Sequence, residues 1–253
     1  MHGRTSRAPT TLHEANSLGF LHRERARFFA GYSEILDVAL EPGPSAGFVI
    51  DVRGVDELTA VTVTASGTTI GAFAPLHAVC EHAPLLAPEG TTPAMLRLRL
   101  SLLDAKVVVA GLGRSRSATP DALNLAGHEL PTVIEMPPLR AGIGFADRRR
   151  TTQDRDASFA LGISVAMRVS ALGRFENVRI VVDFDGVLAR AAQAEAKLEK
   201  QPIDPGLFPE AARLSAYAIE SVDARTSSAA RAVTPLVMAA LRDALAAAKR
   251  SVG

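Results

Sequence analysis

Phe159-Ala-Leu-Gly-Ile-Ser-Val-Ala-Met-Arg-Val-Ser170 is the stretch that decides the fold of the C-terminal part of the chain. Its apolar side chains stand at every second position, which is the period of a β-strand with one buried face. The residues between them are mostly small, which indicates that the second face is covered as well. Gly173 allows a turn, and residues 178–184 are predicted to return as the second strand of a hairpin.

Helices are expected to follow this hairpin. Residues 191–200 and 208–220 have helical composition, and Asp204-Pro205 is a suitable start for the second of these segments. The last helix has the clearest pattern, because six residues fall at helical spacing: Val233, Leu236, Val237, Leu241, Leu245 and Ala248. The C-terminal part is therefore predicted to be a small sheet covered by helices, an α+β unit.

The N-terminal part has a different amino-acid composition: it is rich in Val, Thr and Ile and contains frequent Gly and Pro. Short strands are predicted at residues 48–52, 61–65, 68–72 and 105–110, the second and third joined by a turn at Ser66-Gly67. A short helix is predicted to begin at Leu76 and to end before Pro84.

A connector rich in proline and glycine separates the two parts. Pro131, Pro137, Pro138, Gly142 and Gly144 lie close together, and this density is expected to sustain neither a helix nor an inner strand. We therefore place a domain boundary near residue 138, which divides the chain into residues 1–138 and 139–253. The run at residues 148–150, three arginines, is expected to be a solvated face.

Composition excludes several classes of function. The 253 residues include 28 Lys and Arg against 27 Asp and Glu, so a net charge of +1 argues against a general binder of nucleic acid or of acidic membranes. A single cysteine, Cys80, excludes an internal disulfide framework and any iron–sulfur site made by this chain alone. No apolar run reaches eighteen residues and the start lacks a secretory pattern, so we expect a soluble, cytoplasmic protein without membrane insertion.

The histidines, cysteine and acids carry no pattern of a catalytic or metal site. His77 and His82 lie beside Cys80 but lack a fourth ligand nearby, and Cys80 has no basic neighbour that would lower its pKa. Asp183 and Asp185 flank the end of a predicted strand, where a turn role is expected rather than a pair of catalytic carboxylates. We predict neither a catalytic side chain nor a metal site.

Two small glycine segments remain, although the common GxGxxG and GxxxxGK[ST] signatures are absent. Gly31 follows the apolar pair Phe28-Phe29 and precedes a helix that we expect to open at Ser33; a strand, a turn and a helix N-terminus make an anion site. Ile70-Gly71-Ala72 ends a predicted strand with residues small enough for a cofactor to lie against the backbone.

Read in order, seven motifs resemble those of one family: Pro9-Thr-Thr-Leu-His-Glu-Ala15, Ala30-Gly-Tyr-Ser-Glu-Ile-Leu36 (its AGGTDLL loop), residues 49–58, Thr69-Ile-Gly-Ala-Phe-Ala-Pro-Leu76 (its IGA segment), Ala83-Pro-Leu-Leu86, residues 149–157 and residues 223–231. This family is the medium, FAD-binding subunit of molybdenum hydroxylases, the group of xanthine dehydrogenase and carbon monoxide dehydrogenase. The resemblance spans nearly the whole chain.

The resemblance implies a fold, a cofactor and partners. It implies an FAD-binding domain of the PCMH type over residues 1–138 and a C-terminal flavoprotein domain over residues 139–253. The subunit would relay electrons from the iron–sulfur clusters of a small partner subunit through FAD to an acceptor, while a large subunit holds the molybdopterin cofactor. It also implies nine cofactor-binding residues: Ala30, Gly31, Tyr32, Ser33, Glu34 and Ile35 at the pyrophosphate, and Ile70, Gly71 and Ala72 beside the cofactor.

Two departures from the family keep an alternative open. Tyr32 stands where the family has its second glycine. The family's second FAD loop, expected between Leu86 and Leu102, is missing altogether. The alternative is a degenerate paralogue without FAD that serves as a scaffold or assembly subunit.

Overall fold

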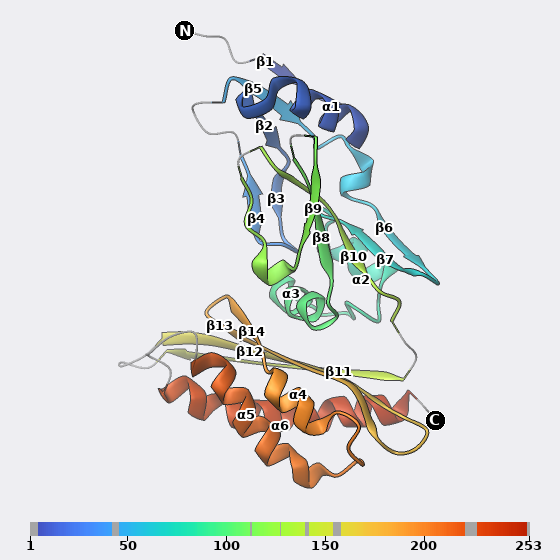
Figure 1. The fold of residues 1–253 in the computed structure, drawn as a ribbon, viewed down its shortest axis with the longest axis vertical. Helices are drawn as coiled ribbons and strands as arrows, with labels where there is room; N and C mark the ends of the chain where they lie inside the picture. Colours follow the sequence, from blue (N-terminus) through green and yellow to red (C-terminus); the bar gives the residue numbers. More distant parts are fainter. Residues whose placement is uncertain are drawn as a thin grey trace. The chain divides into compact units, whose positions relative to one another are not determined.

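The computed structural model describes residues 5–41, 46–111, 113–126, 128–139, 142–153, 158–220 and 227–251 (Figure 1). Residues 154–157 and 223–226, which belong to two of the motifs above, lie outside the described residues. The chain divides into two compact units, residues 1–100 with 104–138 and residues 101–103 with 139–253. Over the described residues, no helix is long and apolar enough to cross a membrane.

The N-terminal unit begins with a small parallel sheet of three strands in the order β1-β5-β2: β1 (Thr5–Arg7), β2 (Ala26–Phe29) and β5 (Phe48–Asp51). Helix α1 (Leu12–His22) connects β1 to β2, and the Thr11 side chain caps it by accepting a hydrogen bond from the Glu14 N–H at 3.2 Å. The apolar side chains of this sheet, such as Phe28 and Ile50, form one buried cluster with Ala15 of α1.

An antiparallel sheet of five strands forms the rest of the scaffold, in the order β6-β7-β10-β8-β9. Its strands are β6 (Val61–Thr64), β7 (Gly67–Gly71), β8 (Lys106–Ala110), β9 (Ser115–Ala118) and β10 (Leu130–Met136). The unit also contains a hairpin of β3 (Gly31–Ser33) and β4 (Val38–Leu40), and two helices, α2 (Leu76–His82) and α3 (Pro93–Leu102). Three short 3₁₀ helices complete it: η1 (Arg23–Arg25), η2 (Asp56–Leu58) and η3 (Pro120–Ala122). The strands predicted at residues 48–52, 61–65, 68–72 and 105–110 and the helix predicted at Leu76 are confirmed.

The prediction that the proline-rich connector holds no inner strand is wrong. Pro131 lies in β10, which pairs with β7 on one side and with β8 on the other. The register of β10 against β8 shifts between Pro131 and Val133. The N–H that proline lacks therefore falls where the ladder is already irregular, and an inner strand tolerates it there.

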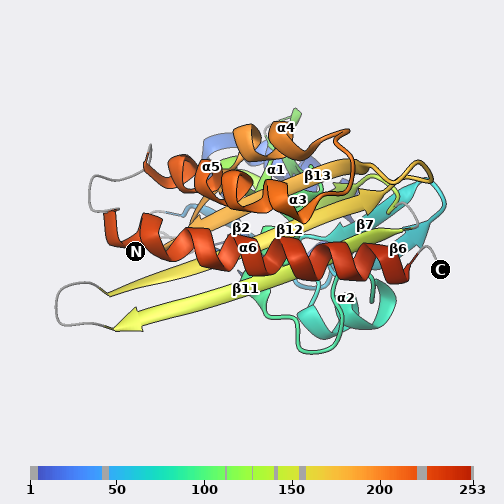
Figure 2. The same cartoon turned by 90° about the horizontal axis from the view of Figure 1, so that it is seen from below.

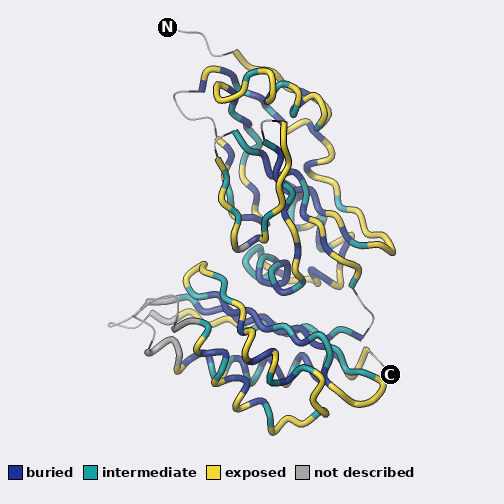
Figure 3. The backbone as a smooth tube through the Cα atoms, viewed as in Figure 1, coloured by how far each residue is buried: buried dark blue, intermediate teal, exposed yellow. Residues whose placement is uncertain are grey.

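The C-terminal unit is an antiparallel sheet of four strands in sequence order: β11 (Ile143–Gln153), β12 (Ser158–Val169), β13 (Phe175–Phe184) and β14 (Val187–Arg190). Helices α4 (Ala192–Leu198), α5 (Phe208–Glu220) and α6 (Ser227–Arg250) cover one face of it, with the short η4 (Pro205–Leu207) leading into α5 (Figure 2). The predicted hairpin and the three predicted helices are confirmed, and Gly173 has a φ of 68° in the hairpin turn. Most of β12 and β13 is buried (Figure 3).

Strand β11 was not predicted, because its glycine and its arginines suggested a connector. A Cβ on Gly144 would lie 2.9 Å from the Ala248 Cα and closer still to the Ala244 carbonyl oxygen. The glycine therefore marks the place where α6 packs tightly on the edge strand. Of the three arginines, Arg148 pairs with Asp243 of α6 and the two that follow are exposed.

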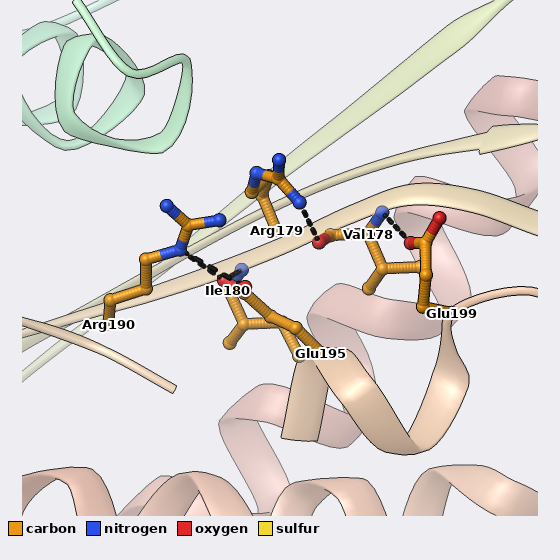
Figure 4. A network of polar contacts seen from close by, with 6 residues as sticks. All are labelled: Val178, Arg179, Ile180, Arg190, Glu195 and Glu199. Carbon is orange, nitrogen blue, oxygen red and sulfur yellow. Dashed lines mark hydrogen bonds and ion pairs between the residues drawn. The ribbon is translucent and has the colours of Figure 1, made fainter. Parts of the chain in front are cut away.

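Two glutamates, Glu195 in α4 and Glu199 directly after it, accept hydrogen bonds from backbone N–H groups of β13 (Figure 4). The buried carboxylate of Glu195 accepts a hydrogen bond from the Ile180 N–H at 2.9 Å, and its two oxygens share the single Nε–H of Arg190, with the Nε at 2.9 and 3.0 Å. Glu199 accepts from the backbone N–H of Asn177 at 3.2 Å and of Val178 at 2.9 Å, next to an irregularity in the pairing of β12 and β13. These carboxylates satisfy strand donors that the ladder leaves open.

The other acidic pair closes the β13–β14 turn. Asp183 accepts a hydrogen bond from the Gly186 N–H at 2.8 Å, and Asp185 accepts one from the Ala160 N–H at 2.7 Å. The turn role predicted for the two aspartates is confirmed.

Candidate functional site

The segment predicted to bind an anion forms a hairpin turn. Strand β3 ends at Ser33, residues 34–37 form the turn, and β4 returns antiparallel to β3. The helix expected to open at Ser33 is therefore wrong. The Ser33 hydroxyl is buried; it donates to the Ala72 carbonyl and accepts from the Leu36 N–H at 3.2 Å, which organises a turn. Asp37, at φ 55°, completes the reversal of the chain.

The structure brings the two predicted cofactor segments together. The hydrogen bond from Ser33 to Ala72 joins residues 30–35 to residues 70–72. The side chains of Ile70 and Ala72 are fully buried. Gly71 faces the end of η2, since a Cβ there would lie 2.6 Å from the Thr59 nitrogen and closer to the Leu58 carbonyl. The packing of η2 on β7 is thus sufficient to explain the glycine.

A cavity of about 360 Å³ lies beside the turn, between it and the beginning of α3. Its lining comes from two parts of the N-terminal unit: Tyr32, Glu34, Ile35 and Asp37 from the hairpin, and Pro93, Ala94 and Arg97 from α3. Two larger hollows of about 680 and 520 Å³ elsewhere in the unit contain none of the nine predicted residues.

Sequence reasoning predicted three of the lining residues and missed the others. Tyr32, Glu34 and Ile35 were among the nine, whereas Asp37 and the α3 residues were not. Arg97 gave a signal that could have been used, because it interrupts the apolar run that α3 needs.

Three of the lining side chains are joined by polar contacts. The Tyr32 hydroxyl donates a hydrogen bond to Asp37 Oδ1, and Arg97 Nη1 lies 3.3 Å from Asp37 Oδ2. The Arg97 side chain is only 16% exposed, against 58% for Asp37. The hydrogen bond to Asp37 raises the pKa of Tyr32 above its ordinary value of 10.0, because ionisation would remove the donor and place a second negative charge beside the carboxylate. With Glu34, the cavity holds two carboxylates and one guanidinium.

Metal chemistry has no candidate site in this arrangement. In the part of the chain that the structure describes, no group of three or more His, Cys, Asp or Glu side chains is placed to hold a metal ion. Cys80 is a free thiol of intermediate exposure.

No protein-family model and no curated protein matches this chain. Solved structures do match it. The carbon monoxide dehydrogenase from Hydrogenophaga pseudoflava that lacks the Mo-pyranopterin moiety of the molybdenum cofactor contains a chain with a TM-score of 0.68 at 20% identity, and the match covers 97% of this chain and 99% of that one. Quinoline 2-oxidoreductase from Pseudomonas putida 86 gives 0.66 at 18%, covering 99% of both chains. Reconstituted carbon monoxide dehydrogenase from Oligotropha carboxidovorans gives 0.64 at 18%, covering 98% of both. Over nearly its whole length, this chain therefore has the fold of a chain found in these molybdenum hydroxylases.

Proposed function

We propose that this chain is the medium, FAD-binding subunit of a molybdenum hydroxylase complex. The observation that carries the proposal is the match over 97% or more of both chains, so that both units of this chain have counterparts in one chain of those enzymes. A shared fold alone does not fix a function. The proposal therefore also draws on the ordered motifs, above all on residues 30–36.

Two features beside the turn support binding of an FAD phosphate group there. Gly31 is in the left-handed region at φ 84°, and beyond its two chain neighbours no residue has an atom within 4 Å of the place a Cβ would take, so a ligand can approach the backbone there. Arg97 supplies a guanidinium for a phosphate. Residues 70–72 fit a supporting role instead, because they are buried behind Ser33. FAD, when bound, would supply the electron transfer, and the residues of the turn would hold and orient it.

The rest of the complex follows from the same proposal. A small iron–sulfur subunit would deliver the electrons and a large molybdopterin subunit would hold the substrate, in the cytoplasm. This chain then needs no catalytic side chain of its own, which agrees with the lack of one in the sequence.

A subunit without FAD, a scaffold or assembly subunit, is the second candidate. The packing of Gly71 against η2 favours it, because that glycine would be kept for the fold alone. The missing second loop also favours it: each lost charge-assisted hydrogen bond costs on the order of 1.5–3 kcal/mol, and about 1.4 kcal/mol is tenfold in affinity.

Flavin absorption of the purified chain separates the two candidates. After incubation with excess FAD and removal of free ligand, the proposal expects about one flavin per chain. Gly31→Trp should abolish the flavin bands. Gly173→Trp is the matched control, because Gly173 also has a positive φ and open space around it, in the other unit. A wild-type chain that stays colourless supports the FAD-free subunit. Iron and molybdenum that copurify with the tagged chain from its native host test the partners; their absence would refute the complex.

A further inference from the structure

We propose that the cavity between the β3–β4 turn and α3 is a subsite for an adenylate group, in which Tyr32 packs against the adenine and Arg97 binds the adjacent phosphate. The inference rests on the proposed function in one respect, namely that the adenylate group is the adenosine half of FAD. It assigns the base to Tyr32, which stands where the family's loop has a glycine, and the phosphate to Arg97, which lies outside the motifs of the family.

The first observation is that the aromatic ring of Tyr32 forms part of the cavity wall. Tyr32 is 57% exposed and lines the cavity, while Ile35, Pro93 and Ala94 supply apolar surface around it. A planar base stacks on an exposed aromatic ring through its π-face. A tyrosine in place of glycine hinders backbone contact with a phosphate, but it gives a base a surface that glycine cannot provide.

The guanidinium is the second observation. Among the described residues that line the cavity, Arg97 is the one cation, beside the carboxylates of Glu34 and Asp37; its side chain is 16% exposed and pairs with Asp37. The 3.3 Å between Arg97 Nη1 and Asp37 Oδ2 is longer than the usual 2.7–2.9 Å of a charge-assisted hydrogen bond. Asp37 also accepts the hydrogen bond of Tyr32. Arg97 can therefore exchange this carboxylate for a phosphate, to which its planar fork is well matched.

Size is the third observation. The cavity volume of about 360 Å³ is at the small end of the range of about 300–1,000 Å³ for small-molecule sites. FAD joins an adenosine monophosphate to a flavin mononucleotide, whose ring system of three fused rings is larger than adenine. The smaller half suits this cavity, and the flavin would then lie outside it.

The test is calorimetric titration of the whole chain with AMP, with FMN and with FAD, followed by competition between AMP and FAD. We expect AMP to bind and to displace FAD, and FMN to do neither. Arg97→Met should weaken AMP binding about 10-fold to 100-fold, as expected for one charge-assisted hydrogen bond. Arg53→Met is the matched control, since Arg53 also pairs with an aspartate, at 2.7 Å from Asp51, and is not in the lining of this cavity.

Two further variants separate binding from folding. Tyr32→Leu should weaken AMP binding about tenfold, whereas Tyr32→Phe, which keeps the ring and loses only the hydrogen bond to Asp37, should weaken it less. Asp37→Asn should tighten AMP binding severalfold, because it removes the competitor for Arg97 and one negative charge from the cavity. A variant that only damaged the fold would weaken binding, so tighter binding is a result that misfolding does not produce.

The outcomes distinguish the inference from the proposed function. FAD binding that AMP does not compete with, or that Arg97→Met leaves unchanged, overturns the subsite and leaves the flavin proposal standing. Competition by FMN but not by AMP also overturns the subsite. AMP binding through Arg97 without FAD binding supports the subsite and refutes the flavin proposal. Binding of none of the three compounds refutes both.

Discussion

Gly71→Ala tests whether the glycine of the IGA segment serves the fold or the cofactor. The added methyl group would lie 2.6 Å from the Thr59 nitrogen and closer to the Leu58 carbonyl, and these are backbone atoms. They are held by hydrogen bonds: Phe73 N–H donates to the Leu58 carbonyl at 2.8 Å and Gly71 N–H to the Ala60 carbonyl at 2.7 Å. Relief of the clash requires η2 to move away from β7 and strains these bonds.

The magnitude follows from that geometry. Overpacking of a core costs about 1–3 kcal/mol, and rigid backbone neighbours place this substitution near 3 kcal/mol. For a unit of this size, 1 kcal/mol corresponds to about 4 °C, so the unfolding midpoint of the N-terminal unit should fall by about 10 °C. Differential scanning calorimetry of the protein without FAD measures the change, with the two units treated as separate transitions.

Gly54→Ala is the matched control for this experiment. Gly54 lies in the same unit, has no positive φ and has no atom within 4 Å of the place that the added methyl group would take. The unfolding temperature of this variant should therefore equal that of the wild type or rise by up to about 4 °C. The reasoning is refuted if Gly71→Ala melts at the wild-type temperature without FAD. If that variant then loses affinity for FAD, the glycine serves close approach of the cofactor.

Two other predictions concern carboxylates. Glu195→Ala should lower the free energy of unfolding of the C-terminal unit by about 2–3 kcal/mol in a urea titration, because it removes the carboxylate that pairs with Arg190 and accepts the buried Ile180 N–H. Glu210→Ala should have a much smaller effect, because its ion pair with Lys197 is exposed. Equal effects would contradict the burial argument. The hydrogen bond from Arg116 lowers the pKa of Glu129 from 4.5 to about 2. Since the folded-state pKa is the lower one, its stabilisation is complete above about pH 4.5 and is lost as the pH falls towards 2. The urea midpoint of Glu129→Gln should therefore depend less on pH over this window, and an unchanged dependence would count against the Arg116 contact.

Regular elements could be predicted where one physical requirement dominates. The alternation from Leu161 to Val169 fixed the face of β12 that packs on the helices, and the apolar stripe of α6 defined its buried side. The hairpin turn followed from Gly173, because a positive φ favours glycine. In each case the residues that decide the structure are neighbours in the sequence.

The predictions were wrong or incomplete where the local structure depends on a partner residue that is distant in the sequence. Pro131 is tolerated in an inner strand because the irregular pairing with β8 falls beside it, and this depends on residues about twenty positions earlier. Ser33 ends a strand because its hydroxyl reaches Ala72. The candidate site also depends on residues that are distant in the sequence, since Asp37 and Arg97 are 60 positions apart. No local pattern indicates such a pair before the fold is known.

Three glycines differ in what lies beside them in the structure. Gly31, Gly71 and Gly144 stood in segments that suggested turns, a cofactor surface or a connector. Gly71 and Gly144 face backbone at distances that no Cβ could occupy, so packing against η2 and α6 accounts for both. Gly31 faces open space and lies beside the cavity that holds Tyr32 and Arg97. Of these three positions, a ligand can reach the backbone only at Gly31. The weight of the flavin proposal therefore rests on the β3–β4 turn and on Arg97, and variants at these positions are the ones that can decide it.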